Sequence, residues 1–503
     1  MRFAILFTVG MIWAASWVSG AEKNIILFIT DDESPTLGCY GDPVAVTPHI
    51  DEVAADGTVF LNAFATTASC SASRSVVLSG LHNHANGQYG HQHSYHKFAS
   101  YPDVVSLALP QVLRNEGYRT VRTGKYHVAP EKVYEFETVI PGNTRNAVAM
   151  ADGVKKVIDA EDERPFFIYF ATSDPHRGGG QDETFVGELK PDLFGNKPKR
   201  GAHDGVEEVF YDPDEVLVPA FLPDTPESRS ELAHYYQSVS RIDQGVGRLV
   251  EHLKEAGLYD KTLFVFTADH GMAFPGGKTT VFEGGLRVPF VVRDPYQEKR
   301  GVVSEALISH VDITPSLLDF AGGLDVKKGR PKKWMDAKEY WKGNDFIPAN
   351  RGPKGGFQAY HGRSWMPILG KTNPKGWDEI LASHTFHEIQ MYYPMRVIRD
   401  REYKLIWNIA HGQPYPFASD LWAASTWQAQ WAKGKDAPYG LKTVDEYVNR
   451  PAFELYAIDK DPHESTNLAD NPEYADVLKE YQERLKKRQA ELKDPWVMKW
   501  QYE

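Results

Sequence analysis

The sequence is poor in cysteine, in long hydrophobic runs and in positive charge, and each shortage excludes a class of protein. Cys39 and Cys70 are the only cysteines in 503 residues, so neither a disulfide framework nor a cysteine-based zinc site is available. The 56 Lys and Arg residues are outnumbered by 68 Asp and Glu, and a net charge of −12 argues against nucleic-acid binding. An anionic substrate stays open, because a basic pocket can form on an acidic protein. The hydrophobic share of 42% predicts a globular chain rather than a disordered one.

The one long apolar run stands at the N-terminus. Arg2 precedes an apolar stretch from Phe3 to Val18 and small residues at 19–21, a pattern typical of a secretory signal peptide cleaved near Gly20 or Ala21. We therefore expect residues 1–21 to be removed and the mature protein, without a membrane span, to be secreted or periplasmic. An uncleaved membrane anchor is the alternative, although the run is short for a span of ~20 residues.

Four short apolar runs, separated by helical patterns, predict the fold. The runs are nearly continuous in Val, Ile, Leu and Phe, which indicates strands buried on both faces, as in a parallel sheet. They cover residues 24–32, 120–127, 165–176 and 262–271. Helical spacing over residues 48–55 and 230–256 supplies connections between strands. We predict an α/β fold with a mostly parallel central sheet flanked by helices.

The composition changes near the C-terminal quarter of the chain. From about residue 326 to 376 it shifts to Lys, Gly, Pro and Trp, which suggests a long surface excursion or a domain connection. Beyond it, residues 395–409 and 453–459 resemble antiparallel strands, and residues 472–492 a helix. We expect a larger α/β domain over residues 22–375 and a smaller α+β subdomain with an antiparallel sheet over residues 376–503.

Polar side chains follow each of the four predicted parallel strands. An aspartate at such a place is usually a turn or helix cap, but four such ends together point to a ligand site beyond the carboxyl edge of the sheet. Carboxylate oxygens there suit a hard divalent cation such as Ca²⁺. The groups are Asp31 and Asp32, Lys125 and His127, Asp174 and His176, and Asp269 and His270.

A fifth segment, TASCSASRSVVLSGL at residues 67–81, adds a nucleophile and a cation. Cys70 precedes a helical stretch whose free N–H groups would favour an anion, and Arg74 lies one turn further on the same face. At residues 70–74 the sequence resembles the sulfatase family, whose signature is Cys or Ser, any residue, Pro or Ala, any residue, Arg. GKYH, SDPH, TADHG and GKTTVFEGGLRVP follow at family-like distances, so the resemblance extends from about Asn24 to Trp496.

The resemblance implies an alkaline-phosphatase-like fold and a modified nucleophile. A formylglycine-generating enzyme would convert Cys70 to Cα-formylglycine (3-oxoalanine), whose hydrate attacks sulfur. His176 would protonate the leaving group, His127 would take a proton from the geminal hydroxyl, and basic residues would offset charge on the sulfate oxygens. The implied metal ligands are Asp31, Asp32, Cys70, Asp269 and His270, and the implied catalytic residues are Cys70, Arg74, Lys125, His127, His176 and Lys278.

Two positions depart from the commoner family pattern. His270 stands where many sulfatases have Asn, and an imidazole is a softer ligand than an amide oxygen, so Ca²⁺ is less strongly indicated than in those relatives. Ala72 replaces the commoner Pro, which leaves the efficiency of Cys70 conversion open.

Several stretches in both predicted domains resemble one branch of the family, the sulfamidases or heparan N-sulfatases. They lie at residues 62–75, 89–98, 124–131, 173–177, 386–396 and 454–469. The resemblance implies hydrolysis of the N-sulfate of N-sulfoglucosamine in heparin or heparan-type glycans. The histidine-rich HQHSYH stretch, residues 91–96, can also be read as a metal-binding tract. Candidate sugar contacts are His93, His96, Arg177, His387, Glu388 and Arg396.

Other functions remain open from the sequence. An O-sulfatase acting on another sulfated polysaccharide, or a phosphodiester or phosphonate hydrolase, could use the same metal and nucleophile. A glycan-binding protein with an unmodified Cys70 is the non-enzymatic alternative. For Cys39 we favour the role of a small buried hydrophobic residue over a disulfide with Cys70. The sequence also leaves a homodimer open.

Overall fold

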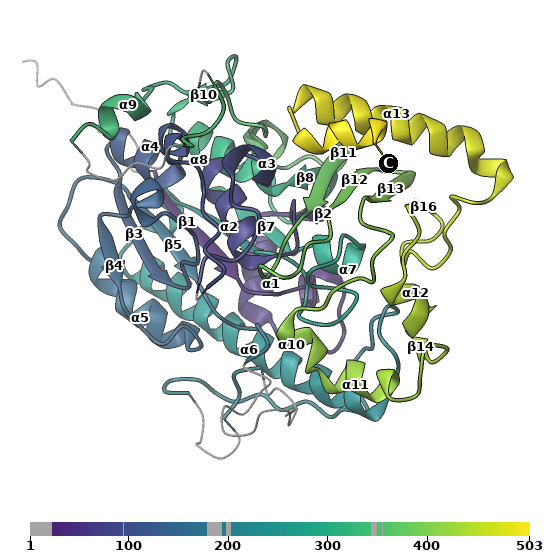
Figure 1. Ribbon diagram of the computed structural model, residues 1–503. Coiled ribbons are helices and arrows are strands. Elements are labelled where there is room, and N and C mark those ends of the chain that lie inside the picture. Colours follow the sequence, from purple (N-terminus) through teal and green to yellow (C-terminus); the bar gives the residue numbers. More distant parts are fainter. Residues whose placement is uncertain are drawn as a thin grey trace, which may run out of the picture.

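The computed structural model describes residues 23–93, 95–178, 194–197, 203–343, 350–354 and 356–502; the expected signal peptide, residues 1–21, lies outside these ranges. Within them, an eight-stranded sheet has the order β4-β3-β5-β1-β6-β7-β2-β8, and a four-stranded sheet has the order β11-β12-β13-β16 (Figure 1). Among the described helices, none has both the length and the apolar character needed to cross a bilayer.

The large sheet is mostly parallel, as predicted. Only β7 runs antiparallel to its neighbours β6 and β2. The four predicted runs form β3, β5, β1 and β6, which lie side by side at the centre of the sheet. The strands are β1 (Asn24–Thr30), β2 (Thr58–Phe64), β3 (Arg119–Gly124), β4 (Thr138–Ile140), β5 (Phe166–Ala171), β6 (Thr262–Ala268), β7 (Phe290–Arg293) and β8 (Val302–Ser309).

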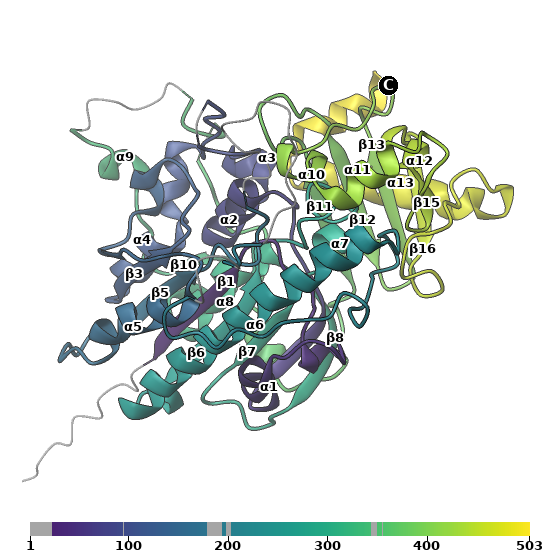
Figure 2. The same ribbon diagram turned by 90° about the horizontal axis from the view of Figure 1, so that it is seen from below.

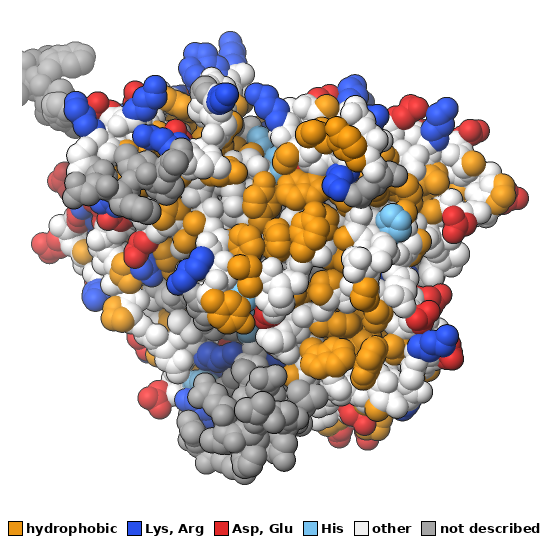
Figure 3. Space-filling view, viewed as in Figure 1, with side chains coloured by type: hydrophobic (Ala, Val, Ile, Leu, Met, Phe, Trp, Pro, Cys, Tyr) orange, Lys and Arg blue, Asp and Glu red, His pale blue; other side chains and the backbone are white. Residues whose placement is uncertain are grey.

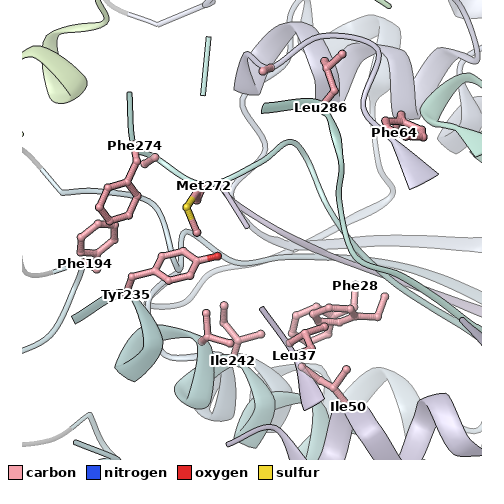
Figure 4. Packing of buried hydrophobic residues seen from close by; sticks show 14 of the residues in the cluster. Phe28, Leu37, Ile50, Phe64, Phe194, Tyr235, Ile242, Met272, Phe274 and Leu286 are labelled. Atoms are coloured by element: carbon pink, nitrogen blue, oxygen red, sulfur yellow. The ribbon is translucent and has the colours of Figure 1, made fainter. Parts of the chain in front are cut away.

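Helices cover both faces of this sheet, so its central strands are apolar on both sides. On β1, Ile26 and Phe28 pack with α1 (Pro48–Ala55), α5 (Ala147–Ile158) and α6 (Pro226–Glu255). Leu27 and its neighbours on the other side pack with α2 (Cys70–Ser79), α4 (Leu109–Asn115) and α8 (Ile313–Phe320). Figure 2 shows α6 crossing the face of the sheet, and Figure 4 shows Phe28 beside Leu37 and Ile50. Each such side chain contributes about 1.5–3 kcal/mol when fully buried.

The two helices predicted between the parallel strands are present with small differences in their ends. The first coincides with α1, where Pro48 supplies the fixed φ that a first helical position favours. The second, α6, begins at Pro226, four residues before the predicted start. There the Thr225 side chain accepts a hydrogen bond from the backbone N–H of Ser228 and caps the helix.

The four-stranded sheet is antiparallel, as predicted, and consists of β11 (Glu379–His384), β12 (Met395–Asp400), β13 (Tyr403–Asn408) and β16 (Phe453–Ala457). Helix α13 (Ala475–Glu491), yellow in Figure 1, packs Tyr481 and Leu485 against Ile398 and Leu405. A domain boundary at residues 375 and 376 stays a prediction; β11 begins three residues later.

The remaining elements are short. Residues 326–376, predicted as an excursion, hold little regular structure in their described parts. On the face drawn in Figure 3, hydrophobic side chains gather near the middle and charged side chains lie mainly toward the margin. The short elements are α3 (Asn83–Asn86), α7 (Glu283–Leu286), α9 (Ala337–Tyr340), α10 (Ser419–Trp422), α11 (Ser425–Trp431), α12 (Val444–Val448), β9 (Leu324–Asp325), β10 (Arg330–Pro331), β14 (Pro438–Tyr439) and β15 (Lys442–Thr443).

Candidate active site

Three buried aspartates meet at the carboxyl edge of the large sheet. Asp31 and Asp32 follow β1, and Asp269 follows the neighbouring strand β6; all three are fully buried. The backbone N–H of Asp32 donates to Asp269 Oδ1 at 2.9 Å, and Asp32 adopts a left-handed backbone with φ 61°. Such a conformation is uncommon for a residue other than glycine and is typical of sites whose surroundings hold the backbone in place.

Arg74 ties two of these carboxylates together from helix α2. Its guanidinium donates to Asp269 Oδ2 at 2.9 Å and to Asp31 Oδ1 at 3.0 Å, and it is itself fully buried. Burial alone would raise the pKa of Asp31, but Lys125, His176 and Arg74 together hold it well below its usual value. Asp31 is therefore an anion whose charge is matched by neighbouring cations.

Cys70 is the first residue of α2 and faces the aspartates. Its Sγ lies 3.6 Å from Asp32 Oδ1 and 3.4 Å from His270 Nε2, and the residue is fully buried. Burial raises the pKa of the Cys70 thiol well above its usual value, by more than Lys125 and Lys278 lower it. Since the thiolate is the nucleophilic form, the unmodified side chain is a weak nucleophile in this setting.

Lys278 links Asp32 to two further residues of the site, His176 and Asp420. Its Nζ lies 3.0 Å from Asp32 Oδ2, 3.0 Å from His176 Nε2 and 2.8 Å from Asp420 Oδ2. Burial, followed by the charge of Lys278, lowers the pKa of His176 to about 4, so its ring is neutral at neutral pH. Lys125, which follows β3, donates to Asp31.

Asp420 is a site residue that the sequence analysis missed. It lies on α10, far along the chain from the sheet edge, and its side chain is 15% exposed. Lys278 and His176 hold its pKa below the usual value against the effect of burial. The surrounding sequence PFASDLW carries no motif that would have indicated this role.

The other predicted histidines lie beside the start of α2. His127 follows β3, and its Nε2 is 2.7 Å from Nδ1 of the exposed His93. His387, in the loop after β11, contacts Ser69 Oγ through Nδ1 at 3.0 Å. His96 accepts a hydrogen bond from the backbone N–H of Ile389 at 3.0 Å, and Glu388 accepts one from the Ser419 hydroxyl at 2.8 Å.

Arg177 and Arg396, also predicted as sugar contacts, are instead engaged with buried carboxylates. Arg177 makes a two-pronged ion pair with Glu231 at 2.9 and 3.1 Å. Arg396 does the same with Asp494 at 2.5 and 3.2 Å. Both arginines are almost completely buried, so their charges are matched within the protein. Their partners lie 54 and 98 residues away in the sequence, which is why the pairing could not be anticipated.

The donor set fits a divalent cation. Atoms of Asp32, Cys70, Asp269 and His270 lie within 4.8 Å of one another, as do those of Asp31, Asp32, Cys70 and His176. His270 Nδ1 faces the carbonyl oxygen of Gly271 at 3.0 Å and must donate to it, so the lone pair on Nε2 points at the cluster. Burial raises the pKa of Asp269 to about 6 in spite of Arg74, and an added positive charge would favour its ionised form.

Cys39 plays no part in this cluster. It is free, as is Cys70, so the alternative of a disulfide between the two is not realised. Cys39 is partly buried and packs against the hydrophobic core beneath α1 and α6.

Comparison with known proteins gives a consistent result. The family model described as "Sulfatase" matches residues 23–323. Human N-sulphoglucosamine sulphohydrolase is 36% identical over 492 residues, covering 94% of this chain and 91% of the human one. Two solved structures share the fold at lower identity. A phosphonate monoester hydrolase of Agrobacterium radiobacter (TM-score 0.61, 18% identity) covers 93% of this chain and 96% of its own. The second is a protein in complex with its substrate D-glucosamine-2-N,6-O-disulfate, with a TM-score of 0.60 and 19% identity. The match covers 94% of this chain and 98% of that protein's chain.

Proposed function

This chain belongs to the sulfatase family, and from that membership we propose that it hydrolyses the N-sulfate of N-sulfoglucosamine in heparin or heparan-type glycans. The observation that carries the choice of substrate is the 36% identity to the human N-sulphoglucosamine sulphohydrolase, which covers 94% of this chain and so includes both sheets. Identity confined to the sheet edge would have supported a sulfatase without favouring a substrate.

The nucleophile in this proposal is residue 70 after a separate formylglycine-generating enzyme has converted it to Cα-formylglycine. Two features support the conversion. The thiol is buried, with a raised pKa, and would be a weak nucleophile itself. Its place at the first position of α2 directs free backbone N–H groups at an anionic substrate.

In the proposed reaction two histidines and Asp32 transfer the protons. As the sulfuryl group moves from nitrogen to an oxygen on residue 70, the attacking hydroxyl would give its proton to Asp32, whose Oδ1 faces residue 70. His176 is neutral without substrate, and the negative charge of a bound sulfate would raise its pKa so that it takes up a proton. It then passes that proton to the departing nitrogen, which would otherwise leave as a very poor anion. His127 then takes the proton of the remaining hydroxyl on residue 70. The carbon–oxygen bond to sulfate breaks, sulfate departs, and water adds to the aldehyde to restore the diol.

The basic side chains and the metal ion would offset the negative charge of the sulfate. Arg74, Lys125 and Lys278 supply three positive charges around Asp31 and Asp32, and they would offset charge on the sulfate oxygens. One divalent cation, for which we propose Ca²⁺, would be held by residue 70 with Asp31, Asp32, Asp269 and His270. It would polarise the sulfate and help to orient the attacking oxygen.

The rim of the site would contact the sugar. His93, His96, His387 and Glu388 lie on the loops that flank the start of α2, and we propose them as sugar-binding residues. The apolar N-terminal segment, outside the described residues, supports a secreted or periplasmic location.

A substrate comparison tests the proposal. The purified protein is incubated with glucosamine saccharides that carry a single N-, 2-O- or 6-O-sulfate, and released sulfate is measured, with an aryl phosphate as a further substrate. We expect the N-sulfate to be released fastest. Faster release of an O-sulfate would favour an O-sulfatase, and a dominant phosphatase rate would favour the phosphonate hydrolase alternative, to which the imidazole of His270 lends support.

A second measurement tests the nucleophile. Mass spectrometry of the peptide that contains residue 70, taken from natively expressed protein, is expected to show loss of the thiol and gain of an aldehyde. A thiol at full occupancy would overturn the catalytic proposal and leave a glycan-binding protein.

A further inference from the structure

A group of histidines that supplies no ligand to the carboxylate cluster lies beside the start of α2. The chain has 18 histidines, and five of them gather here from three distant segments. Adjacent rings have centroids between 3.9 and 6.0 Å apart. The five are His91, His93 and His96 from the loop after α3, His127 from the segment after β3, and His387 from the loop after β11.

Three of these rings have the spacing of metal ligands. One nitrogen each from His91, His93 and His127 lies within 4.8 Å of the other two. The closest pair is His93 Nδ1 and His127 Nε2 at 2.7 Å, with ring planes 15° apart. Zinc–nitrogen bonds of about 2.0–2.1 Å in a tetrahedral site put ligand nitrogens about 3.3 Å apart, so modest side-chain rotations would accommodate the ion.

The rings are also in a suitable chemical state. Burial lowers the pKa of His91 and of His127 well below the usual histidine value, and the pKa of His93 is lowered as well, so all three rings are neutral and each has one nitrogen with a lone pair. Nε2 of His91 lies 2.8 Å from Nε2 of His387 and would have to give up that contact to bind an ion through this nitrogen. The Ser71 hydroxyl lies 3.3 Å from Nδ1 of His91 and can fix the orientation of that ring. His93 is exposed and gives an ion access from solvent.

We propose that His91, His93 and His127 form a second metal site, which takes an imidazole-preferring ion such as Zn²⁺, and that its occupation inhibits the enzyme. Neutral imidazoles favour Zn²⁺ over Ca²⁺, whereas the carboxylate cluster favours the harder ion, so the two sites have different preferences. The inhibition rests on the proposed function. An ion bound to the ring of His127 withdraws its electrons and keeps His127 from accepting the proton of the hydroxyl on residue 70.

Calorimetric titration with ZnCl₂ tests the site. The full enzyme is titrated in excess Ca²⁺, which keeps the carboxylate cluster filled, and Co²⁺ serves as a spectroscopic probe of nitrogen coordination. The test variant is His93→Ala, whose side chain is exposed and supports no core, and the matched control is His411→Ala, another exposed histidine. We expect one Zn²⁺ per chain in the parent enzyme and in the control. His93→Ala should bind about 100-fold more weakly, since even an outer partner of a metal-bound histidine is worth about 10–100-fold. Equal affinity in His93→Ala and the parent would overturn the site.

Turnover separates the two proposals. Zn²⁺ should inhibit release of N-sulfate over the same concentration range in which it binds, and a chelator selective for Zn²⁺ should restore activity. Binding without inhibition would overturn the regulatory half of the inference. Absence of turnover in zinc-free, calcium-loaded enzyme would instead overturn the proposed function, while the calorimetric result for the histidine site would stand.

Discussion

Lys278 contacts site residues from two distant parts of the chain, one after strand β1 and one on helix α10. It contacts Asp32 from the large sheet and Asp420 from α10, and it lies within hydrogen-bond distance of His176. A lysine with two carboxylate partners stays charged although it is buried, and both carboxylates together raise its pKa well above the usual value. The position of Lys278 therefore depends in part on Asp420, which makes no contact with the aspartates after β1 and β6 in the described structure.

Asp420→Asn is expected to lower kcat/KM by about 10–100-fold while changing the melting temperature little. The amide keeps the shape of the side chain but removes one of the two charges that hold Lys278, so the ammonium can shift from the place where it offsets charge in the transition state. Steady-state kinetics with N-sulfoglucosamine provide the measurement. Asp436→Asn, at an exposed position, is the matched control and should behave like the parent. Parent-like kinetics in Asp420→Asn would remove Asp420 from the positioning role.

His176→Ala should affect two substrates unequally. General acid catalysis is worth about 10²–10⁴-fold where the leaving group needs a proton. Release of N-sulfate should fall by that factor, whereas an aryl sulfate with a good leaving group should lose much less. The ratio of the two kcat/KM values, measured on the same preparation, is the readout. A common loss on both substrates would indicate that His176 acts by another route, for example through its contact with Lys278.

At the scale of elements, the sequence predicts the centre of the fold better than its edges. β1, β3, β5 and β6 are continuous apolar runs because helices cover both their faces. β2, β7 and β8 were not predicted. β7 has four residues, β8 alternates at the sheet edge, and the antiparallel direction of β7 depends on contacts with β6 and β2 that no local pattern contains.

The site residues, too, were predictable only in part. Residues that stand directly after a predicted strand, such as Asp31 and Asp269, could be expected at the sheet edge. Asp420 could not, because α10 has only four residues and reaches the site through tertiary packing. The burial and ion pairing of Arg177 and Arg396 depend on carboxylates that lie on other elements. A sequence pattern does not reveal such partners.

The ion pair between Arg396 and Asp494 joins β12 to the segment after α13. Both side chains are buried, and Arg396 also lies 4.4 Å from the ring of Trp496. Asp494→Ala should lower the free energy of unfolding by about 3–5 kcal/mol, since it leaves a buried guanidinium without its partner. Urea denaturation is the measurement. Glu52→Ala, which breaks the exposed pair with Lys254, is the control and should cost about 1 kcal/mol or less.

The same pair predicts a dependence on pH. Arg396 holds the pKa of Asp494 below its usual value in the folded state, although burial alone would raise it. A depressed folded-state pKa contributes stability above the unfolded value of about 3.9, and that contribution is lost as the pH falls through and below this value. The difference in unfolding free energy between the parent and Asp494→Ala should therefore shrink on acidification below about pH 4. A constant difference would contradict this origin of the stability.

At the scale of the whole molecule, the carboxylate cluster concentrates negative charge at a place where many elements converge. Three fully buried aspartates approach one another between β1, β6 and α2, and together with Asp420 they set four carboxylates against the three cations Arg74, Lys125 and Lys278. A cation that binds the folded state alone stabilises it, by about 2.7 kcal/mol at a free concentration 100 times its Kd.

Removal of the cation is therefore expected to lower the melting temperature by a few degrees. Dialysis against a chelator, followed by thermal unfolding with and without added Ca²⁺, measures the effect, and Mg²⁺ at equal concentration serves as the comparison ion. Ca²⁺ should restore the original value better than Mg²⁺, because the larger ion tolerates irregular coordination. A melting temperature that responds to neither chelator nor cation would argue against a resident metal.

The complete burial of Cys70 has a consequence for the order of events in the life of the protein. A modifying enzyme must surround the residue it oxidises, yet in the folded chain Cys70, the first residue of α2, faces Asp32 and His270 and has no exposed surface. The conversion that we propose for residue 70 would therefore have to come before folding, on a chain that is still extended. Under that proposal a molecule that folds first would keep its thiol, and the fraction of active enzyme would be set by the relative rates of oxidation and folding.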